Sequence, residues 1–179
     1  MFQLIIPAIE KWDETNENFI VSKEQVIQIE HSLVSISKWE SKWCKPFLSK
    51  DSKTIEETTD YIRCMTITQN INPEVYNNVT NDNIKEVSKY IEASMSATWF
   101  RKDKNAVSKE IITSEIIYYW MITYNIPFEC QKWHLNRLLT LITVCNKKNE
   151  KPKKMSNAEI MSRNTELNNE RRKKSNSKG

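Results

Sequence analysis

The sequence contains a single glycine, Gly179, at its last position. Phosphate-binding loops need several glycines at fixed spacing, because only a residue without a Cβ lets the backbone curl closely around a phosphate. The tight turns of many-stranded barrels depend on glycine as well. The sequence therefore excludes the nucleotide-binding classes that use such loops. Low glycine content with long stretches of Ile, Leu, Lys and Glu favours helices instead.

Charge is distributed unevenly along the chain. Residues 147–179 carry 11 Lys or Arg and 4 Asp or Glu, whereas residues 1–146 carry 16 and 19. We therefore expect two parts: a mainly helical globular domain over 1–146, and a basic hinge with a C-terminal helix or tail over 147–179. No stretch approaches the roughly 20 apolar residues that span a bilayer, so we expect no membrane partner.

The first 32 residues read as β-structure. FQLIIPAI, FIVS and QVIQIEHS are rich in β-branched residues and partly alternate, which predicts two or three short antiparallel strands, with EKWDETNEN as a turn region. Pro7 marks a sheet edge or a kink, because proline cannot donate a ladder hydrogen bond. We expect a small N-terminal β-hairpin within residues 1–32.

From residue 33 the hydrophobic period becomes helical. Ile36, Trp39 and Trp43 are spaced to share one helix face, and Pro46 should end that helix. Thr54 with Glu57 forms a capping box, in which each side chain satisfies the other residue's backbone N–H. The buried stripe of that second helix is expected to be Ile55, Ile62 and Met65.

Three further helices are expected, over 83–93, 109–124 and 127–146. Ser108 can cap the second of these, which is apolar around much of its circumference and so should lie at the centre of a bundle. Pro127 suits the first turn of the third. Because the link between the last two is short, they should pack as an antiparallel hairpin.

Two chemical sites can be assembled on paper around Cys130 and His134. A structural zinc site needs four ligands, and the only other histidine is His31. A cysteine nucleophile needs a base and an orienting group, which His134 and Asn136 can supply. The zinc site lacks the paired ligand spacing that such sites show, and nothing obvious supplies an oxyanion hole to the cysteine site. We interpret Cys130 as a buried thiol beside a hydrogen-bonded histidine, and we predict no metal, no cofactor and no enzymatic activity.

Trp39 and Trp43 admit two interpretations. An exposed aromatic pair can anchor a binding partner. A tryptophan pair beside apolar residues belongs more often to the core, and the sequence favours that interpretation.

The basic segment has three interpretations. It can neutralise phosphates as a nucleic-acid arm, although it contains no aromatic residue to stack on bases. It can be a solvated tail without a target. It can also be a helix that docks on a protein. In that case SNAE (156–159) is its capping box, its thin stripe includes Ala158, and its contact residues are Met161, Arg163, Leu167, Arg171 and Arg172.

Three segments carry a resemblance to a known family: HSLVSISKWESKW, IPFECQKWHLNRLLTLITVCN and KPKKMSNAEIMSRNTELNNERRKK. Together they resemble tail assembly chaperones of long-tailed (siphovirus-type) bacteriophages of Gram-positive hosts. The resemblance implies a mainly helical cytoplasmic protein, acting in tail morphogenesis. Its expected partner is the tape-measure protein, with the tail tube protein as a second one, and it is not expected in the mature virion. It also implies no catalytic residues.

The fold expected overall is mainly α: a helical bundle with a small N-terminal antiparallel β-element and a C-terminal basic helix. The expected function is non-enzymatic binding of the tape-measure protein. The alternative is a basic-tailed nucleic-acid-binding protein or a head–tail connector of the virion.

Overall fold

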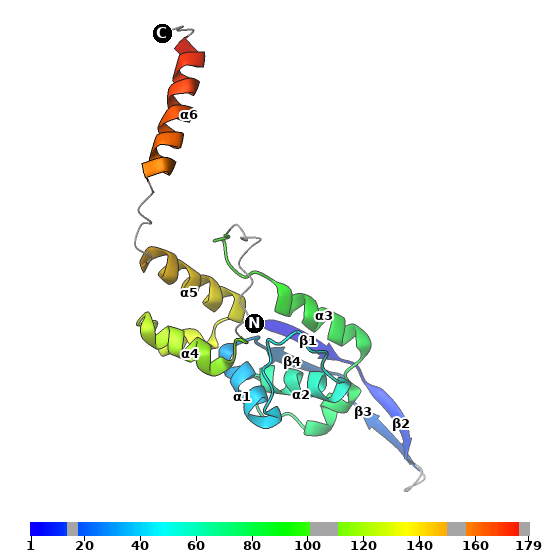
Figure 1. Cartoon of the computed structure of the whole chain (residues 1–179). Coiled ribbons are helices and arrows are strands. Elements are labelled where there is room, and N and C mark those ends of the chain that lie inside the picture. Colours follow the sequence, from blue (N-terminus) through cyan, green and yellow to red (C-terminus); the bar gives the residue numbers. More distant parts are fainter. Residues whose placement is uncertain (14–17, 101–110, 150–156, 176–179) are drawn as a thin grey trace. The chain divides into compact units, whose positions relative to one another are not determined.

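The predicted fold class is confirmed by the structure, a computed structural model, in which helices dominate and a small antiparallel β-element lies at the N-terminus (Figure 1). The chain divides into two compact units, Met1–Asn146 and Lys147–Gly179. The structure describes residues 1–13, 18–100, 111–149 and 157–175.

The elements are as follows. The strands are β1 (Phe2–Ile6), β2 (Ile9–Asp13), β3 (Asn18–Ser22) and β4 (Gln25–Ile29). The α-helices are α1 (Leu33–Trp43), α2 (Ile55–Met65), α3 (Asn81–Glu92), α4 (Ser114–Thr123), α5 (Leu135–Asn149) and α6 (Asn157–Ser175). Two 3-10 helices join them, η1 (Pro73–Asn78) and η2 (Phe128–Lys132).

The strands form two two-stranded antiparallel sheets that share one register. β1 pairs with β4 and β2 with β3, both antiparallel, and the register continues across the gap from Ile6 opposite Gln25 to Ile9 opposite Ser22. Pro7 lies in the gap and has no N–H to donate, so it breaks the ladder without shifting the register. The expectation of two or three strands was therefore wrong. EKW belongs to β2 and is not a turn, because β3 satisfies its backbone.

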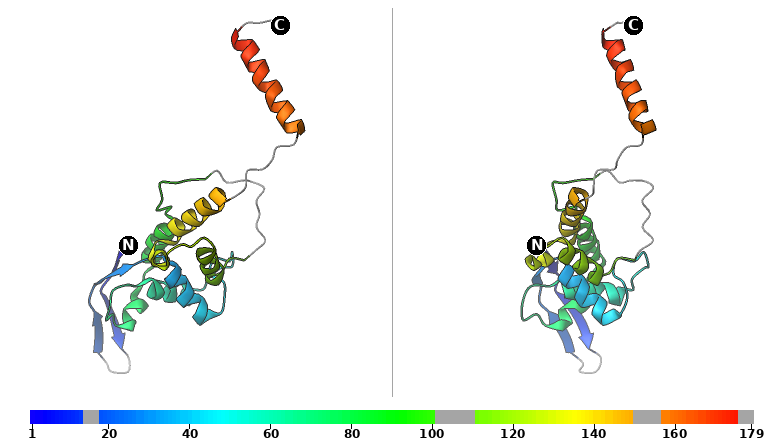
Figure 2. Two further views of the ribbon diagram at one scale, coloured as in Figure 1. Left: turned by 90° about the vertical axis from the view of Figure 1, so that its left-hand side faces the viewer. Right: turned by 60° about the vertical axis from the view of Figure 1, so that its left-hand side comes forward.

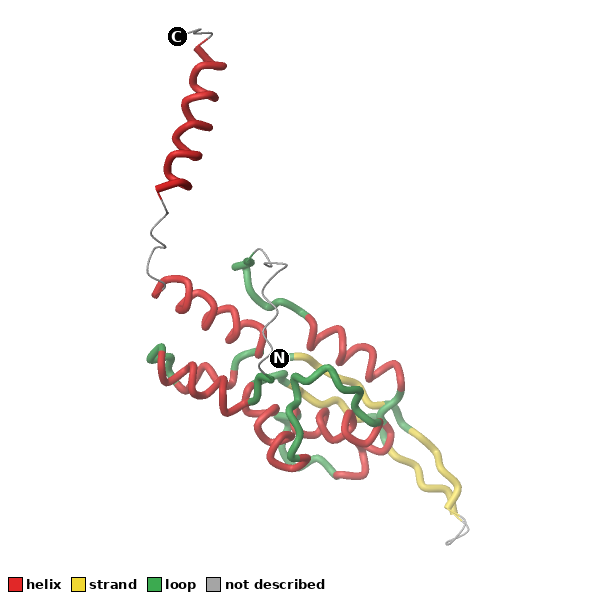
Figure 3. Tube along the Cα trace, in the orientation of Figure 1, coloured by secondary structure: helices red, strands yellow, loops and turns green. Residues whose placement is uncertain are grey.

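The sheet is buried on one side only. Leu4, Ile6 and Ile27 lie in the core, whereas Ile5 and Val26 are exposed, as the two-residue period of a strand requires. The helices of the first unit gather over the buried side (Figure 2). The β2–β3 end extends beyond them (Figure 3).

α1 and α2 begin and end where the sequence indicates. Ser32 caps α1, and Cys44 ends it in the left-handed conformation, φ 51°. The predicted capping box of α2 is present, with the Glu57 N–H donating to Thr54 Oγ1 at 3.1 Å and the Thr54 N–H donating to Glu57 Oε2 at 2.8 Å. Ile55 is 78% exposed, however, so its place in the stripe was predicted wrongly, and Tyr61 is buried instead.

The core of the first unit is continuous from the sheet to α5. Its fully buried large side chains come from the strands, α1, α2, α4 and α5, and are Leu4, Ile6, Ile27, Ile29, Leu33, Ile36, Trp39, Ile62, Met65, Ile117, Met121 and Leu135. Tyr90 of α3 stacks on Phe2 of β1 with ring centroids 5.0 Å apart, which fixes α3 along the sheet.

The helix expected over 109–124 is shorter and less central than predicted. α4 begins at Ser114, and the proposed cap Ser108 lies outside the described residues. Only one side of α4 is buried, through Ile117 and Met121, while Tyr119 and Ile122 are exposed. A helix whose apolar residues surround its axis is thus placed at the side of the bundle.

The helix expected over 127–146 is split. Pro127 precedes η2, and α5 starts only at Leu135. Between them, Ser32 and His134 form an antiparallel bridge, which holds residue 134 out of the helix. The antiparallel hairpin is also wrong: the Tyr124 hydroxyl donates to Asn146 Oδ1 at 3.1 Å, joining the ends at which α4 and α5 both finish. Between the two helices, η2 carries the chain back before α5 begins.

Candidate functional site

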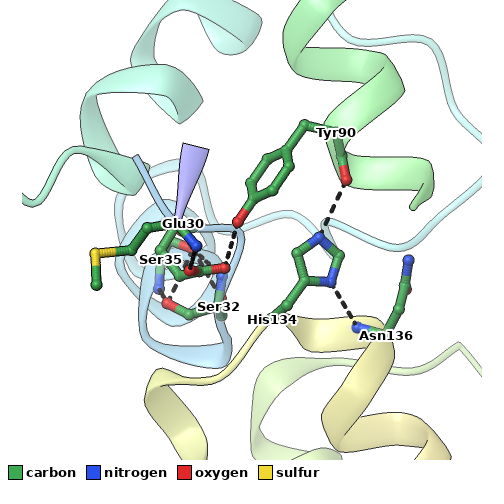
Figure 4. A network of polar contacts seen from close by, with 7 residues as sticks. Glu30, Ser32, Ser35, Tyr90, His134 and Asn136 are labelled. Carbon is green, nitrogen blue, oxygen red and sulfur yellow. Dashed lines mark hydrogen bonds and ion pairs between the residues drawn. The ribbon is translucent and has the colours of Figure 1, made fainter. Parts of the chain in front are cut away.

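His134 and Asn136 lie together at the start of α5 and use their polar atoms in structural hydrogen bonds, whereas Cys130 lies in η2. His134 is buried; its Nε2 donates to the Tyr90 carbonyl at 3.1 Å, and its Nδ1 accepts from the Asn136 N–H at 3.3 Å (Figure 4). The Asn136 amide donates to the carbonyls of Ile91 and Ala93 at 2.9 and 2.8 Å. His134 therefore stands at the N-cap position of α5, where side-chain acceptors stabilise a helix start.

The pKa of the Cys130 thiol is shifted in the opposite direction from that of a nucleophilic cysteine. It is buried in η2. Burial and then Glu129 raise its pKa. An activated cysteine needs a lowered pKa, which cationic neighbours or a helix N-terminus supply. This arrangement favours the interpretation of Cys130 as a structural thiol.

The two histidines form one buried cluster. The His31 and His134 rings lie 5.1 Å apart between centroids, edge to face. His31 Nδ1 is 2.6 Å from the Tyr61 hydroxyl. Burial, and then the neighbouring His134, lower the pKa of His31 to about 3, and burial also lowers the pKa of His134. Both imidazoles are therefore neutral at pH 7. Within the described ranges, no group of three or more His, Cys, Asp or Glu is arranged to hold a metal ion.

Backbone bonds tie this cluster to three elements. The Leu135 N–H donates to the His31 carbonyl at 2.7 Å, and Ser32 bridges His134. With the bonds to the end of α3, these contacts join the β4–α1 corner, the start of α5 and the end of α3. We call His31, His134 and these backbone partners the histidine seam.

Glu30 lies at the edge of the seam. Its carboxylate accepts from the Tyr90 hydroxyl at 2.6 Å and pairs with the Met1 ammonium at 2.7 Å (Figure 4). Burial and the bond to Glu30 raise the pKa of Tyr90. Both oxygens of this carboxylate are thus engaged.

The tryptophan pair lies at the border of the core. Trp39 is 1% exposed and its indole donates to the Glu57 carbonyl at 2.9 Å, as the interpretation of a core residue expects. Trp43 is half-buried and donates to Asp60 Oδ2 at 2.9 Å. Asp60 also pairs with Lys42 at 2.6 Å. Of the two candidate anchors, only Trp43 offers surface to a partner in this conformation.

The sequence-predicted contact residues of the tail lie on α6. Met161 is 71% exposed and Leu167 is 42% exposed, and Arg163, Arg171 and Arg172 are exposed too. Ser156 and the side chain of Glu159, members of the proposed capping box, are outside the described residues.

Ile160 is an exposed apolar residue of α6 that the sequence analysis did not include among the candidate contact residues. It is 42% exposed, as is Leu167. The two are seven residues apart, close to two helical turns, so they lie on the same side of α6 with Met161 next to Ile160. This spacing was the signal in the sequence that could have identified Ile160. α6 thus carries two exposed apolar residues on one side, with Met161 about 100° around the axis, and its stripe remains thin.

None of the helices in the described part of the chain has both the length and the apolar character needed to cross a membrane. Comparisons of the chain with family models, curated proteins and solved structures found no match.

Proposed function

We propose that this chain is a phage tail assembly chaperone, which binds the tape-measure protein in the host cytoplasm and has no catalytic role. The observation that carries the proposal is α6: Ile160, Met161 and Leu167 are exposed on a helix that also presents arginines. The sequence resemblance supports the identity of the partner, and the exposed helix supports the mode of binding.

The chemistry of α6 suits a polypeptide partner. Residues 147–179 have a net charge of +7 from 11 basic and 4 acidic residues. A helix with so few apolar residues is marginal alone and gains stability when it packs on another surface. Amphipathic partner helices with an acidic flank would cover the apolar side and meet the arginines. Such a chaperone keeps the apolar seams of a long helical protein covered until tail tube subunits enclose it.

The test is binding of purified tape-measure segments to three proteins: the full chain, a 1–150 truncation, and the double variant Ile160→Ser/Leu167→Ser. The remaining 42% exposure of each side chain is worth about 1 kcal/mol when covered, so the double variant should bind about 30-fold more weakly. The matched control is Asn168→Ser/Asn169→Ser, two exposed polar positions of the same helix, which should bind like the parent. Equal affinity of the full chain and the truncation would remove α6 from the mechanism.

The net charge of residues 147–179 supports a second candidate function, a nucleic-acid-binding or connector protein of the virion. Phosphate neutralisation gives affinity that falls steeply with salt. DNA binding with a steep salt slope, lost on deleting 147–179, would favour the nucleic-acid form. Finding the protein in purified virions would favour the connector.

A further inference from the structure

The histidine seam contains a hydrogen bond that a proton would disrupt. His134 Nδ1 accepts the Asn136 N–H while its Nε2 donates to Tyr90. A proton on Nδ1 would face the Asn136 N–H, so that two donors would oppose each other at the start of α5. The Nε2–H bond to Tyr90 persists in the protonated ring, so protonation disturbs the cap of α5 and leaves a positive charge in the buried seam.

No free counter-charge is available for either imidazole among the described residues. His31 faces the Tyr61 hydroxyl from α2, the Phe47 ring and His134. His134 faces the Tyr90 ring of α3, together with Glu30 and the Met1 ammonium, which act on it with opposite signs. Glu30 is already shared between the ammonium and the Tyr90 hydroxyl. A buried charge without a partner is costly, and a second one 5.1 Å away adds repulsion.

We propose that the histidine seam is an acid-operated latch: protonation of its two imidazoles releases the start of α5 from the β4–α1 corner, while the sheet stays packed on α1 and α2. Release exposes the buried side of α5, which includes Leu135, Leu138 and Ile142. This latch lies in the first unit and is independent of the proposed role of α6.

The sign of the pH dependence follows from the lowered pKa values. The closed seam excludes protons, whereas the open seam binds them with the ordinary histidine pKa of about 6.5. Above that pH the seam keeps its full stability, and it loses stability as the pH falls towards the closed-state pKa, about 3 for His31. For His31 the open population should be about 30-fold larger at pH 5 than at pH 7.5, and His134 acts in the same direction.

Hydrogen exchange measured at pH 7.5 and pH 5.0 tests the latch, with protection factors corrected for the intrinsic rate. The Leu135 and Leu138 amides, bonded to His31 and His134, should lose protection about 30-fold or more. The Ile67 amide, bonded to the Gln28 carbonyl of β4, and the Thr58 amide, bonded to the Thr54 carbonyl at the start of α2, serve as controls away from the seam and should change little. The chain has only two histidines, the side chains whose ordinary pKa lies inside this window.

The double variant His31→Asn/His134→Asn keeps side-chain acceptors but cannot titrate, so its Leu135 protection should not depend on pH. Unchanged protection of Leu135 in the parent would overturn the latch. So would the same pH response in the double variant, or an equal loss of protection in the control amides. Imidazole NMR titration of the parent gives a second measurement that needs no variant: two histidines titrating near pH 6.5 in the folded protein would also overturn it.

Discussion

Glu40 is a buried carboxylate that caps a helix from a distant part of the chain. It is 8% exposed on α1; Oε1 accepts the Phe47 N–H at 2.7 Å and Oε2 accepts the Ser114 N–H at 2.8 Å. Ser114 opens α4, and Thr113 before it makes no side-chain cap. A negative charge at a helix N-terminus is stabilising, so Glu40 supplies both the missing acceptor and the favourable charge.

Glu40→Ala would leave two buried N–H groups without acceptors. Each unsatisfied group costs about 1–3 kcal/mol, and the lost charge at the helix start adds about 0.3–1 kcal/mol. We expect the free energy of unfolding to fall by about 3–5 kcal/mol. Glu40→Gln keeps one carbonyl oxygen, so the expected loss is roughly half of that.

Urea denaturation at pH 7 measures both changes. With a urea dependence of about 2 kcal/mol per molar, Glu40→Ala should lower the midpoint by roughly 2 M. Glu86→Ala removes an exposed carboxylate from α3 and serves as the matched control, with a change within about 0.5 kcal/mol. A loss below about 1 kcal/mol for Glu40→Ala would refute the role of Glu40 as the cap of α4.

Two further substitutions test the α1–α2 packing by the same urea assay. Thr54→Ala removes one side of the capping box and should cost about 1 kcal/mol; no loss would show that solvent replaces the hydroxyl. Trp39→Phe removes the indole donor to the Glu57 carbonyl and leaves a void, so about 2 kcal/mol or more should be lost. If Trp39→Phe left the free energy of unfolding unchanged, α1 and α2 would have to pack closely around the smaller ring.

The features that sequence predicted best are local ones. The box of Thr54 and Glu57 depends on residues three apart, and the helix ending before Pro46 depends on its own period and on proline. The buried position of Trp39 follows from the same spacing. In each of these cases the competing conformations differ within a single helix, so short-range rules decide between them.

The features that sequence reasoning missed depend on distant residues. Glu40 and Ser114 are 74 residues apart, and no local sequence pattern around either residue predicts their hydrogen bond. The break before α5 exists because residues 31 and 32 pair with residues 134 and 135. Helix periodicity describes only neighbouring residues, so it does not predict this long-range pairing. The neutral, buried state of His134 is likewise a product of α3 and the sheet, so the histidine seam was not predictable from its spacing to Cys130.

The strand register is continuous from the β2–β3 pair to the β1–β4 pair, whose inner face lies in the protein interior. Leu4 opposite Ile27 and Trp12 opposite Phe19 belong to the same alignment, with Pro7 between them. Inserting one residue within β2 would therefore offset every pairing on the way back to β1, turning Gln3 and Ile5 inward in place of Leu4 and Ile6 unless a bulge absorbed the extra residue. The β2–β3 pair, although it extends beyond the helices, thus shares one alignment with the buried strands.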